Sequence, residues 1–302
     1  MLKKVSLFLG IVMMVVALSG CKSKIDNKDS LGKLKVVVTF NAMREFADAV
    51  GKDKIYIETI IPEGTEPHEF EPKARDMESL NKSQIFIYNG LGMESWTKDT
   101  LEAVDNKKLI SVDASTGARA IKNTDPGIVK TDGQSDPHLW LSLKGAQSQS
   151  KNIKDAFVLA DPTNKGYYEK NYLEFYNKLE ELYKEYNTKF SSLTNKTFVT
   201  GHAAFAYLAK DFGLKQNSVE DVFADGEPSA KKLKELIEFG KKNKIKTIFV
   251  EDAVSPKVSK ALADGVGATT EKIYTLENKE GNKDYLQSMR GNLEKIYLSL
   301  KF

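Results

Sequence analysis

The stretch DPTNKGYYEKNYLEFYNKLEELYKEYNTKFSSL, residues 161–193, decides the fold. It begins with helix-capping residues, and no glycine or proline occurs over residues 167–193. Large apolar side chains recur at helical spacing in it, at Tyr168, Tyr172, Phe175, Leu179, Leu182 and Tyr186. We predict one connecting helix over residues 161–194. Its stretch without glycine or proline, residues 167–193, would span about 40 Å at about 1.5 Å per residue, which is enough to join two lobes. The alternative is a helix that belongs wholly to one lobe, because an apolar stripe does not identify its packing partner.

On both sides of this helix, short apolar runs alternate with amphipathic segments, which is the pattern of α/β layers. We expect an N-terminal βα lobe over residues 34–160 and a C-terminal βα lobe over residues 195–302. The expected strands are residues 35–39, 55–61, 85–88 and 109–112, then 198–200, 245–250 and 273–276. The expected helices include residues 42–50, 94–104, 203–212, 230–239 and 257–264. The fold class is therefore α/β, with two lobes joined by a single long helix.

The composition is that of an ordinary globular protein: 302 residues, 29% charged, 41% hydrophobic and a formal net charge of +3. Acidic and basic residues are interleaved, so we expect no nucleic-acid partner. The single cysteine excludes an internal disulfide and any zinc site that needs two thiolates from one chain. We expect a monomer.

The N-terminus has the form of an export signal. Lys3 and Lys4 precede an uncharged stretch over residues 5–19, so we predict a signal peptide over residues 1–20. The sequence LSGC at 18–21 resembles the bacterial lipobox, although an incidental Cys21 in a general secretory signal is the alternative. The resemblance implies a lipidated Cys21, a polar tether over residues 21–33 and a protein anchored to the outer face of the cell membrane.

All three histidines fall at loop positions beside regular elements. His68 lies in IPEGTEPHEFEP (61–72), His138 in DPHLWL (136–141), and His202 in FVTGHAAF (198–205), where a strand turns into a helix. One such histidine alone is more often a packed residue than a ligand. Three of them, two in the first lobe and one in the second, indicate a metal site between the lobes. Neutral imidazoles suit Zn²⁺, and a carboxylate would complete a tetrahedron.

These segments resemble the metal-binding lipoproteins that serve bacterial ABC importers, the zinc and manganese solute-binding family. The resemblance extends over residues 36–300 and is carried by PHE at 67–69, DPHLW at 136–140, GHAAF at 201–205, SPK at 255–257 and residues 285–293. It implies two βα lobes joined by a rigid long helix, with metal bound in the cleft between them as cargo and passed to a membrane permease.

The resemblance also bears on which metal is bound. Zinc members of this family carry histidine at the third ligand position, where manganese members usually carry glutamate, and this chain has His202 there. Imidazole in place of carboxylate favours Zn²⁺ over Mn²⁺. Residues 118–135 contain no histidine, unlike the His-rich loop of many zinc members. The chain is most similar to the short-loop zinc subgroup, which includes streptococcal laminin-binding lipoproteins, and a manganese or iron receptor is the alternative.

The fourth ligand is less determined. The resemblance implies Glu277, which follows the last expected strand, with Glu66 or water as alternatives. Asp136 either orients His138 from behind or serves as a turn residue before proline. Glu251 and Asp252 end a strand, and we interpret them as a solvated surface pair. The alternative is that this strand faces the cleft, where the two carboxylates would tune the electrostatic field rather than bind the metal.

Three functions remain to be compared. The leading hypothesis is a surface-anchored Zn²⁺ receptor of an ABC permease, which is not an enzyme, because four protein ligands leave no position for a reactive water. A secreted zinc hydrolase would need an open fourth position, and the sequence lacks His-Glu-x-x-His and Gly-x-Ser-x-Gly. The subgroup resemblance also allows an adhesin that binds laminin, although no sequence feature shows such a surface.

Overall fold

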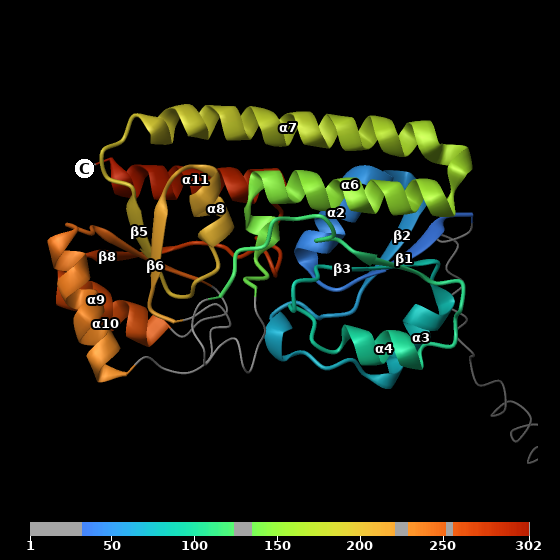
Figure 1. Ribbon diagram of the computed structural model, residues 1–302, viewed down its shortest axis with the longest axis horizontal. Helices are drawn as coiled ribbons and strands as arrows, with labels where there is room; N and C mark the ends of the chain where they lie inside the picture. Colours follow the sequence, from blue (N-terminus) through green and yellow to red (C-terminus); the bar gives the residue numbers. More distant parts are fainter. Residues whose placement is uncertain (1–31, 124–134, 221–228, 252–255, 302) are drawn as a thin grey trace, which may run out of the picture. The chain divides into compact units, whose positions relative to one another are not determined.

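Each lobe is built on a four-stranded parallel sheet, and the two sheets have equivalent strand orders (Figure 1). The N-terminal sheet, in the order β2-β1-β3-β4, consists of β1 (Leu34–Val38), β2 (Ile55–Thr59), β3 (Ile85–Tyr88) and β4 (Ile110–Asp113). The C-terminal sheet, in the order β6-β5-β7-β8, consists of β5 (Thr197–Thr200), β6 (Lys215–Ser218), β7 (Thr247–Val250) and β8 (Thr269–Lys272). In each sheet the first strand in chain order, β1 or β5, is an inner strand. The next strand, β2 or β6, lies on one side of it, and the following strand, β3 or β7, lies on the other side. In open α/β sheets such a change of direction places a crevice beyond the carboxyl end of the first strand.

The computed structural model describes residues 32–123, 135–220, 229–251 and 256–301. The predicted signal peptide, Cys21, most of the predicted tether and Asp252 lie outside these ranges. In the part of the chain that is described, no helix has both the length and the apolar character needed to cross a membrane.

Helices cover the sheets and connect the strands. The N-terminal lobe contains α2 (Asn41–Gly51), α3 (Ala74–Lys82), α4 (Thr97–Ala103) and α6 (Leu143–Ala160). The C-terminal lobe contains α8 (Ala206–Asp211), α9 (Ala230–Lys242), α10 (Pro256–Val266) and α11 (Tyr285–Leu300). Short 3-10 turns are η2 (Lys52–Lys54), η3 (Pro67–Glu69), η4 (Leu139–Leu141) and η5 (Pro162–Asn164).

The long helix α7 (Lys165–Ser191) packs on helices of both lobes (Figure 1). Near its start, Asn171 Nδ2 donates to the carbonyl of Val50 in α2 at 2.9 Å. Near its end, the Tyr186 hydroxyl donates to Glu294 Oε2 in α11 at 2.8 Å. The apolar stripe expected from the sequence is mostly buried. The prediction of two βα lobes with a long helix between them is confirmed, and the one-lobe alternative is wrong.

One hydrophobic core continues from the first lobe into the second. At its centre lies Trp140 of η4, which is fully buried and packs edge-on against Phe40 with ring centroids 4.9 Å apart. Its Nε1 donates to the carbonyl of Thr275 at 2.6 Å, and its own carbonyl accepts the Tyr285 hydroxyl at 2.6 Å. A smaller second core lies between the C-terminal sheet and helices α9 and α10. The large core therefore stabilises each lobe and also holds the two lobes together.

The outer strands of the C-terminal sheet differ from the sequence prediction. The apolar run 273–276 was expected as a strand, but the strand is the preceding TTEK of β8, all four residues of which are exposed. The run itself leaves the sheet and enters the core, where Ile273 and Leu276 are buried. Strand β6, KQNS, was not expected at all, because it has no apolar run. Both are edge strands, which do not need apolar side chains on both faces.

We expect Trp140→Ala to lower the free energy of unfolding by about 3–5 kcal/mol, since it opens a cavity in the shared core and removes the N–H that donates to the Thr275 carbonyl. Urea unfolding followed by circular dichroism measures this change. Leu159→Ala is the matched control, because Leu159 is 68% exposed and its truncation should alter stability by less than about 0.5 kcal/mol. A loss below about 1 kcal/mol for Trp140→Ala would contradict its role at the junction of the lobes.

Candidate metal centre

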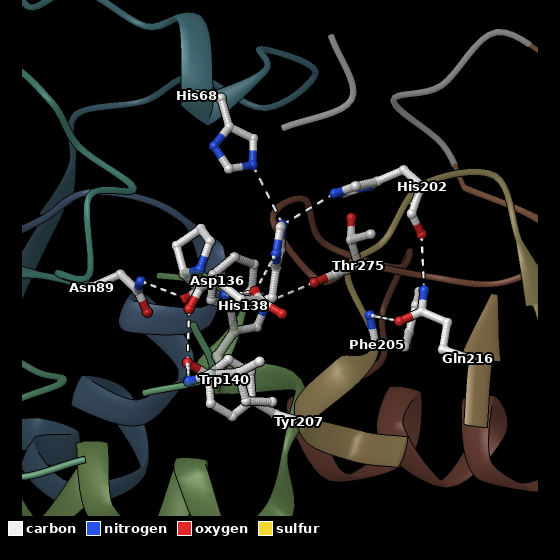
Figure 2. A network of polar contacts seen from close by, with 12 residues as sticks. His68, Asn89, Asp136, His138, Trp140, His202, Phe205, Tyr207, Gln216 and Thr275 are labelled. Atoms are coloured by element: carbon white, nitrogen blue, oxygen red, sulfur yellow. Dashed lines mark hydrogen bonds and ion pairs between the residues drawn. The ribbon is translucent and has the colours of Figure 1, made fainter. Parts of the chain in front are cut away.

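The three histidines converge on one point (Figure 2). His68 is carried by η3, His138 immediately precedes η4, and His202 follows β5. His138 Nε2 lies 3.3 Å from His68 Nε2 and 3.1 Å from His202 Nε2. The first two residues come from the N-terminal lobe and the third from the C-terminal lobe, so the structure brings them together across the junction.

These separations fit a metal ion of known geometry. With zinc–nitrogen bonds of about 2.0–2.1 Å, two nitrogens on a tetrahedral zinc lie about 3.3 Å apart. The same distances also fall in the range of hydrogen bonds between imidazole nitrogens. The three rings can therefore receive a metal with little movement of their Nε2 atoms.

His138 is held from behind by Asp136. Asp136 Oδ1 accepts both the backbone N–H and the ring Nδ1–H of His138, each at 2.9 Å. Donation from Nδ1 leaves Nε2 with its lone pair directed toward the other two rings. Asp136 thus fulfils both of the roles considered from the sequence, as a turn residue and as a residue that orients the imidazole.

The backbone beside His138 is fixed by buried polar groups (Figure 2). Asn89, directly after β3, donates its Nδ2 to the carbonyl of Pro137 at 2.9 Å. Tyr207 of α8 donates its hydroxyl to the carbonyl of Asp136 at 2.7 Å. One anchor belongs to the N-terminal lobe and the other to the C-terminal lobe, so the loop that carries His138 is held by both.

His202 is held at both of its backbone groups. Its N–H donates to Glu251 Oε1 at 3.3 Å, while its carbonyl accepts Gln216 Nε2 at 3.0 Å and the Thr200 hydroxyl at 2.6 Å. Glu251 is only 3% exposed, so the interpretation of this residue as a solvated surface group is wrong. It is buried because β7 ends beside β5, at the same edge of the sheet as the turn that carries His202.

Two carboxylates lie beside the histidines. Glu66, His68 and Glu277 form a second group whose ligand atoms all lie within 4.8 Å of one another. Glu66 Oε1 accepts the backbone N–H of His68 at 3.2 Å. Glu277 Oε2 accepts the Thr275 hydroxyl at 2.8 Å, whereas its buried Oε1 has no hydrogen-bond partner among the residues that the structure describes. Both carboxylates proposed from the sequence therefore reach the site, on the side of His68.

Burial determines the protonation of the site. It lowers the pKa of His138 to about 3, and it is the main cause that lowers the pKa of His68 well below its usual value. Burial first, and the nearby Glu66 carboxylate second, raise the pKa of Glu277 to about 8, and burial raises the pKa of Glu251 to about 8. Without a cation, the buried groups therefore favour their neutral forms. Neutral imidazoles are the form that binds metal.

Sequence reasoning missed Asn89 and Gln216. Asn89 directly follows a correctly predicted strand, so a search for polar residues at carboxyl ends of strands would have found it. Gln216 lies on the polar edge strand β6, for which the sequence contains no strand signal.

The chain matches the family described as zinc-uptake complex component A periplasmic over residues 36–298. The chain belongs to this family. A putative metal-binding protein of Treponema pallidum is 42% identical over 297 residues, which cover 95% of this chain and 93% of the relative. The high-affinity zinc uptake system protein ZnuA of Bacillus subtilis is 38% identical over 300 residues, covering 95% and 94%.

Solved structures agree with this assignment. The laminin-binding protein Lmb of Streptococcus agalactiae, described as bifunctional with adhesin and metal-transporting activity, superposes with a TM-score of 0.82 at 34% identity. The match covers 89% of this chain and all of that one. The solute-binding family expected from the sequence is confirmed, as is its likeness to the streptococcal laminin-binding proteins.

We expect Gly201→Ala to lower the free energy of unfolding by about 1–3 kcal/mol. A Cβ at this position would lie 2.3 Å from Glu251 Oε2, so the buried carboxylate would have to leave the N–H of His202. Chemical denaturation gives the value. The control Gly166→Ala adds a Cβ with nothing within 4 Å in the first turn of α7 and should be neutral or slightly stabilising. If Gly201→Ala left the free energy of unfolding as little changed as Gly166→Ala does, Glu251 would not constrain this turn.

Proposed function

We propose that the protein is an extracytoplasmic receptor that captures Zn²⁺ as cargo and delivers it to the permease of an ABC importer. The convergence of three imidazole Nε2 atoms, with neighbouring separations of 3.1 and 3.3 Å, is the observation that carries this proposal. The zinc-uptake descriptions of the family and of the Bacillus subtilis relative support zinc as the cargo. Three nitrogen donors also favour Zn²⁺ over Mn²⁺, which prefers oxygen.

The proposed ligands are His68, His138, His202 and Glu277. Glu277 is favoured over Glu66 as the fourth ligand because its buried Oε1 has no hydrogen-bond partner in the described part of the chain, whereas Glu66 Oε1 already caps the N-terminus of η3. A bound cation would supply the charge that a buried carboxylate at this position needs. Four protein ligands close the coordination sphere and leave no open position for water, so the site binds metal and does not catalyse hydrolysis.

Delivery to a permease requires that the receptor stay near the membrane. We propose that Cys21 is lipidated after removal of residues 1–20 and that the monomeric receptor extends from the outer face of the cell membrane on the tether 21–33. The LSGC sequence supports this, because a diacyl chain at its cysteine would give stable attachment.

We expect His202→Ala to weaken zinc affinity by more than about 100-fold, because even the loss of an outer-shell partner costs about 10- to 100-fold. Titration calorimetry with metal-free protein measures the affinity, and metal analysis of protein purified without added metal identifies the native cargo. In competition, Mn²⁺ should displace Zn²⁺ poorly. Unchanged zinc affinity in the variant would remove His202 from the site.

We expect zinc binding at pH 7 to release a proton from Glu277. Its pKa of about 8 means that the metal-free protein holds this proton at pH 7, and zinc must displace it. Because the zinc-bound state holds fewer protons, affinity rises as pH rises toward 8 and weakens below it. Calorimetry in buffers of different ionisation enthalpy should find about one proton fewer released by Glu277→Gln than by the native protein. Equal release by the two proteins would argue against Glu277 as a ligand.

The structural likeness to Lmb supports a second candidate function, adhesion to laminin. The two functions can be separated with the variant in which His68, His138 and His202 are all alanine. Surface plasmon resonance on immobilised laminin should detect binding by this variant if adhesion is independent of metal capture. Absence of laminin binding by the native, zinc-loaded protein would eliminate adhesion.

A further inference from the structure

Two groups of potential metal ligands overlap at His68. One is His68, His138 and His202, and the other is Glu66, His68 and Glu277, with the ligand atoms of each group within 4.8 Å of one another. A single tetrahedral zinc with three histidines and one carboxylate does not use both glutamates. The second group therefore offers an alternative set of donors, one nitrogen and two carboxylates, which shares His68 and Glu277 with the proposed final site and adds Glu66. We call it the outer position.

The outer position is nearer to solvent than the three-histidine position. Glu66, which belongs to the outer position alone, is half-buried, whereas His138 is 0% exposed and His202 is 3% exposed. His68, which both positions share, is half-buried. The third member of the outer position, Glu277, is 4% exposed and has a carboxylate oxygen without a hydrogen-bond partner within the described structure. A buried carboxylate that has one unpartnered oxygen, and whose ligand atom lies within 4.8 Å of two other donors, is an arrangement that a cation would satisfy.

A groove of about 490 Å³ lies beside this position. Its lining includes Glu277 but none of the three histidines, and it continues along residues 61–63 of the His68 loop to Arg44 and Lys279. An ion in solution therefore has an approach toward Glu277 that does not pass His138 or His202.

We propose that Zn²⁺ binds first at the outer position and then moves inward by exchanging Glu66 for His138 and His202. The ion would keep His68 and Glu277 throughout, so no step leaves it without protein ligands. The direction follows from ligand chemistry, because two oxygens and one nitrogen hold zinc less well than three nitrogens and one oxygen. This inference rests on the proposed zinc-receptor function and assigns to Glu66 a role in the path rather than in the final site.

The test is Glu66→Gln, in which the amide oxygen can still accept the His68 N–H. A donor used only along the path affects entry and exit alike, because the same path is followed in both directions. We expect association and dissociation rates of zinc each to fall by about 10-fold or more, with the equilibrium affinity changed by less than about 3-fold. Stopped-flow fluorescence measures association, using Trp140, whose ring centroid lies 5.1 Å from that of His138. A chelator chase measures dissociation.

Glu69→Gln is the matched control. The substitution Glu69→Gln removes the same charge from the same loop as Glu66→Gln does. The Glu69 side chain, however, is exposed and belongs to neither donor group. The zinc rates of the Glu69→Gln variant should stay within about 2-fold of native, and equal slowing of association in both variants would reduce the effect to charge steering and overturn the proposal.

Two further results would also overturn the proposal. Unchanged rates in Glu66→Gln would remove Glu66 from the path. Loss of affinity through faster dissociation alone would make Glu66 a ligand of the final site. In all of these cases zinc binding by the native protein would stand, whereas failure of the native protein to bind zinc would reject the receptor function itself.

Discussion

Removal of three imidazoles from water, at the place where the two lobes meet, is the constraint on which the rest of the structure depends. Burial keeps His138 and His68 neutral and so preserves the lone pairs that a metal needs. The rings can be buried only because the chain on either side is fixed. Trp140 anchors the segment after His138 to the C-terminal lobe, and α7 joins helices of both lobes. The long helix and the shared core are thus the means by which distant histidines are held a few ångströms apart.

The main features of the fold could be predicted from the sequence because they arise from strong local patterns. The stripe of α7 and the valines of β1 are signals of this kind, since each element is buried along most of one face or both. The edge strands β6 and β8 could not be found in this way, because a strand with one side in solvent carries no apolar run. Their position follows from pairing with inner strands that lie far away in the sequence.

The site was predictable in its residue types and less so in its surroundings. Three histidines placed after strands or in proline-bounded loops pointed to one centre, and the coordinates bring them together. The burial of Glu251 was not predictable, because its environment depends on how β7 lies beside β5. The same holds for Gln216, which reaches His202 from a neighbouring strand. Long-range side-chain contacts of this type produce no periodic pattern of residues that could be recognised in a single sequence.

The polar character of the two outer strands of the C-terminal sheet has a consequence for self-association. An open sheet edge can accept a strand from a second molecule, and apolar edges do so readily. Here the edges read KQNS and TTEK, with lysines and few apolar groups. Lysine on an edge opposes intermolecular strand pairing, because docking would bury its charge. These two edges therefore disfavour the joining of separate copies of the chain through this sheet.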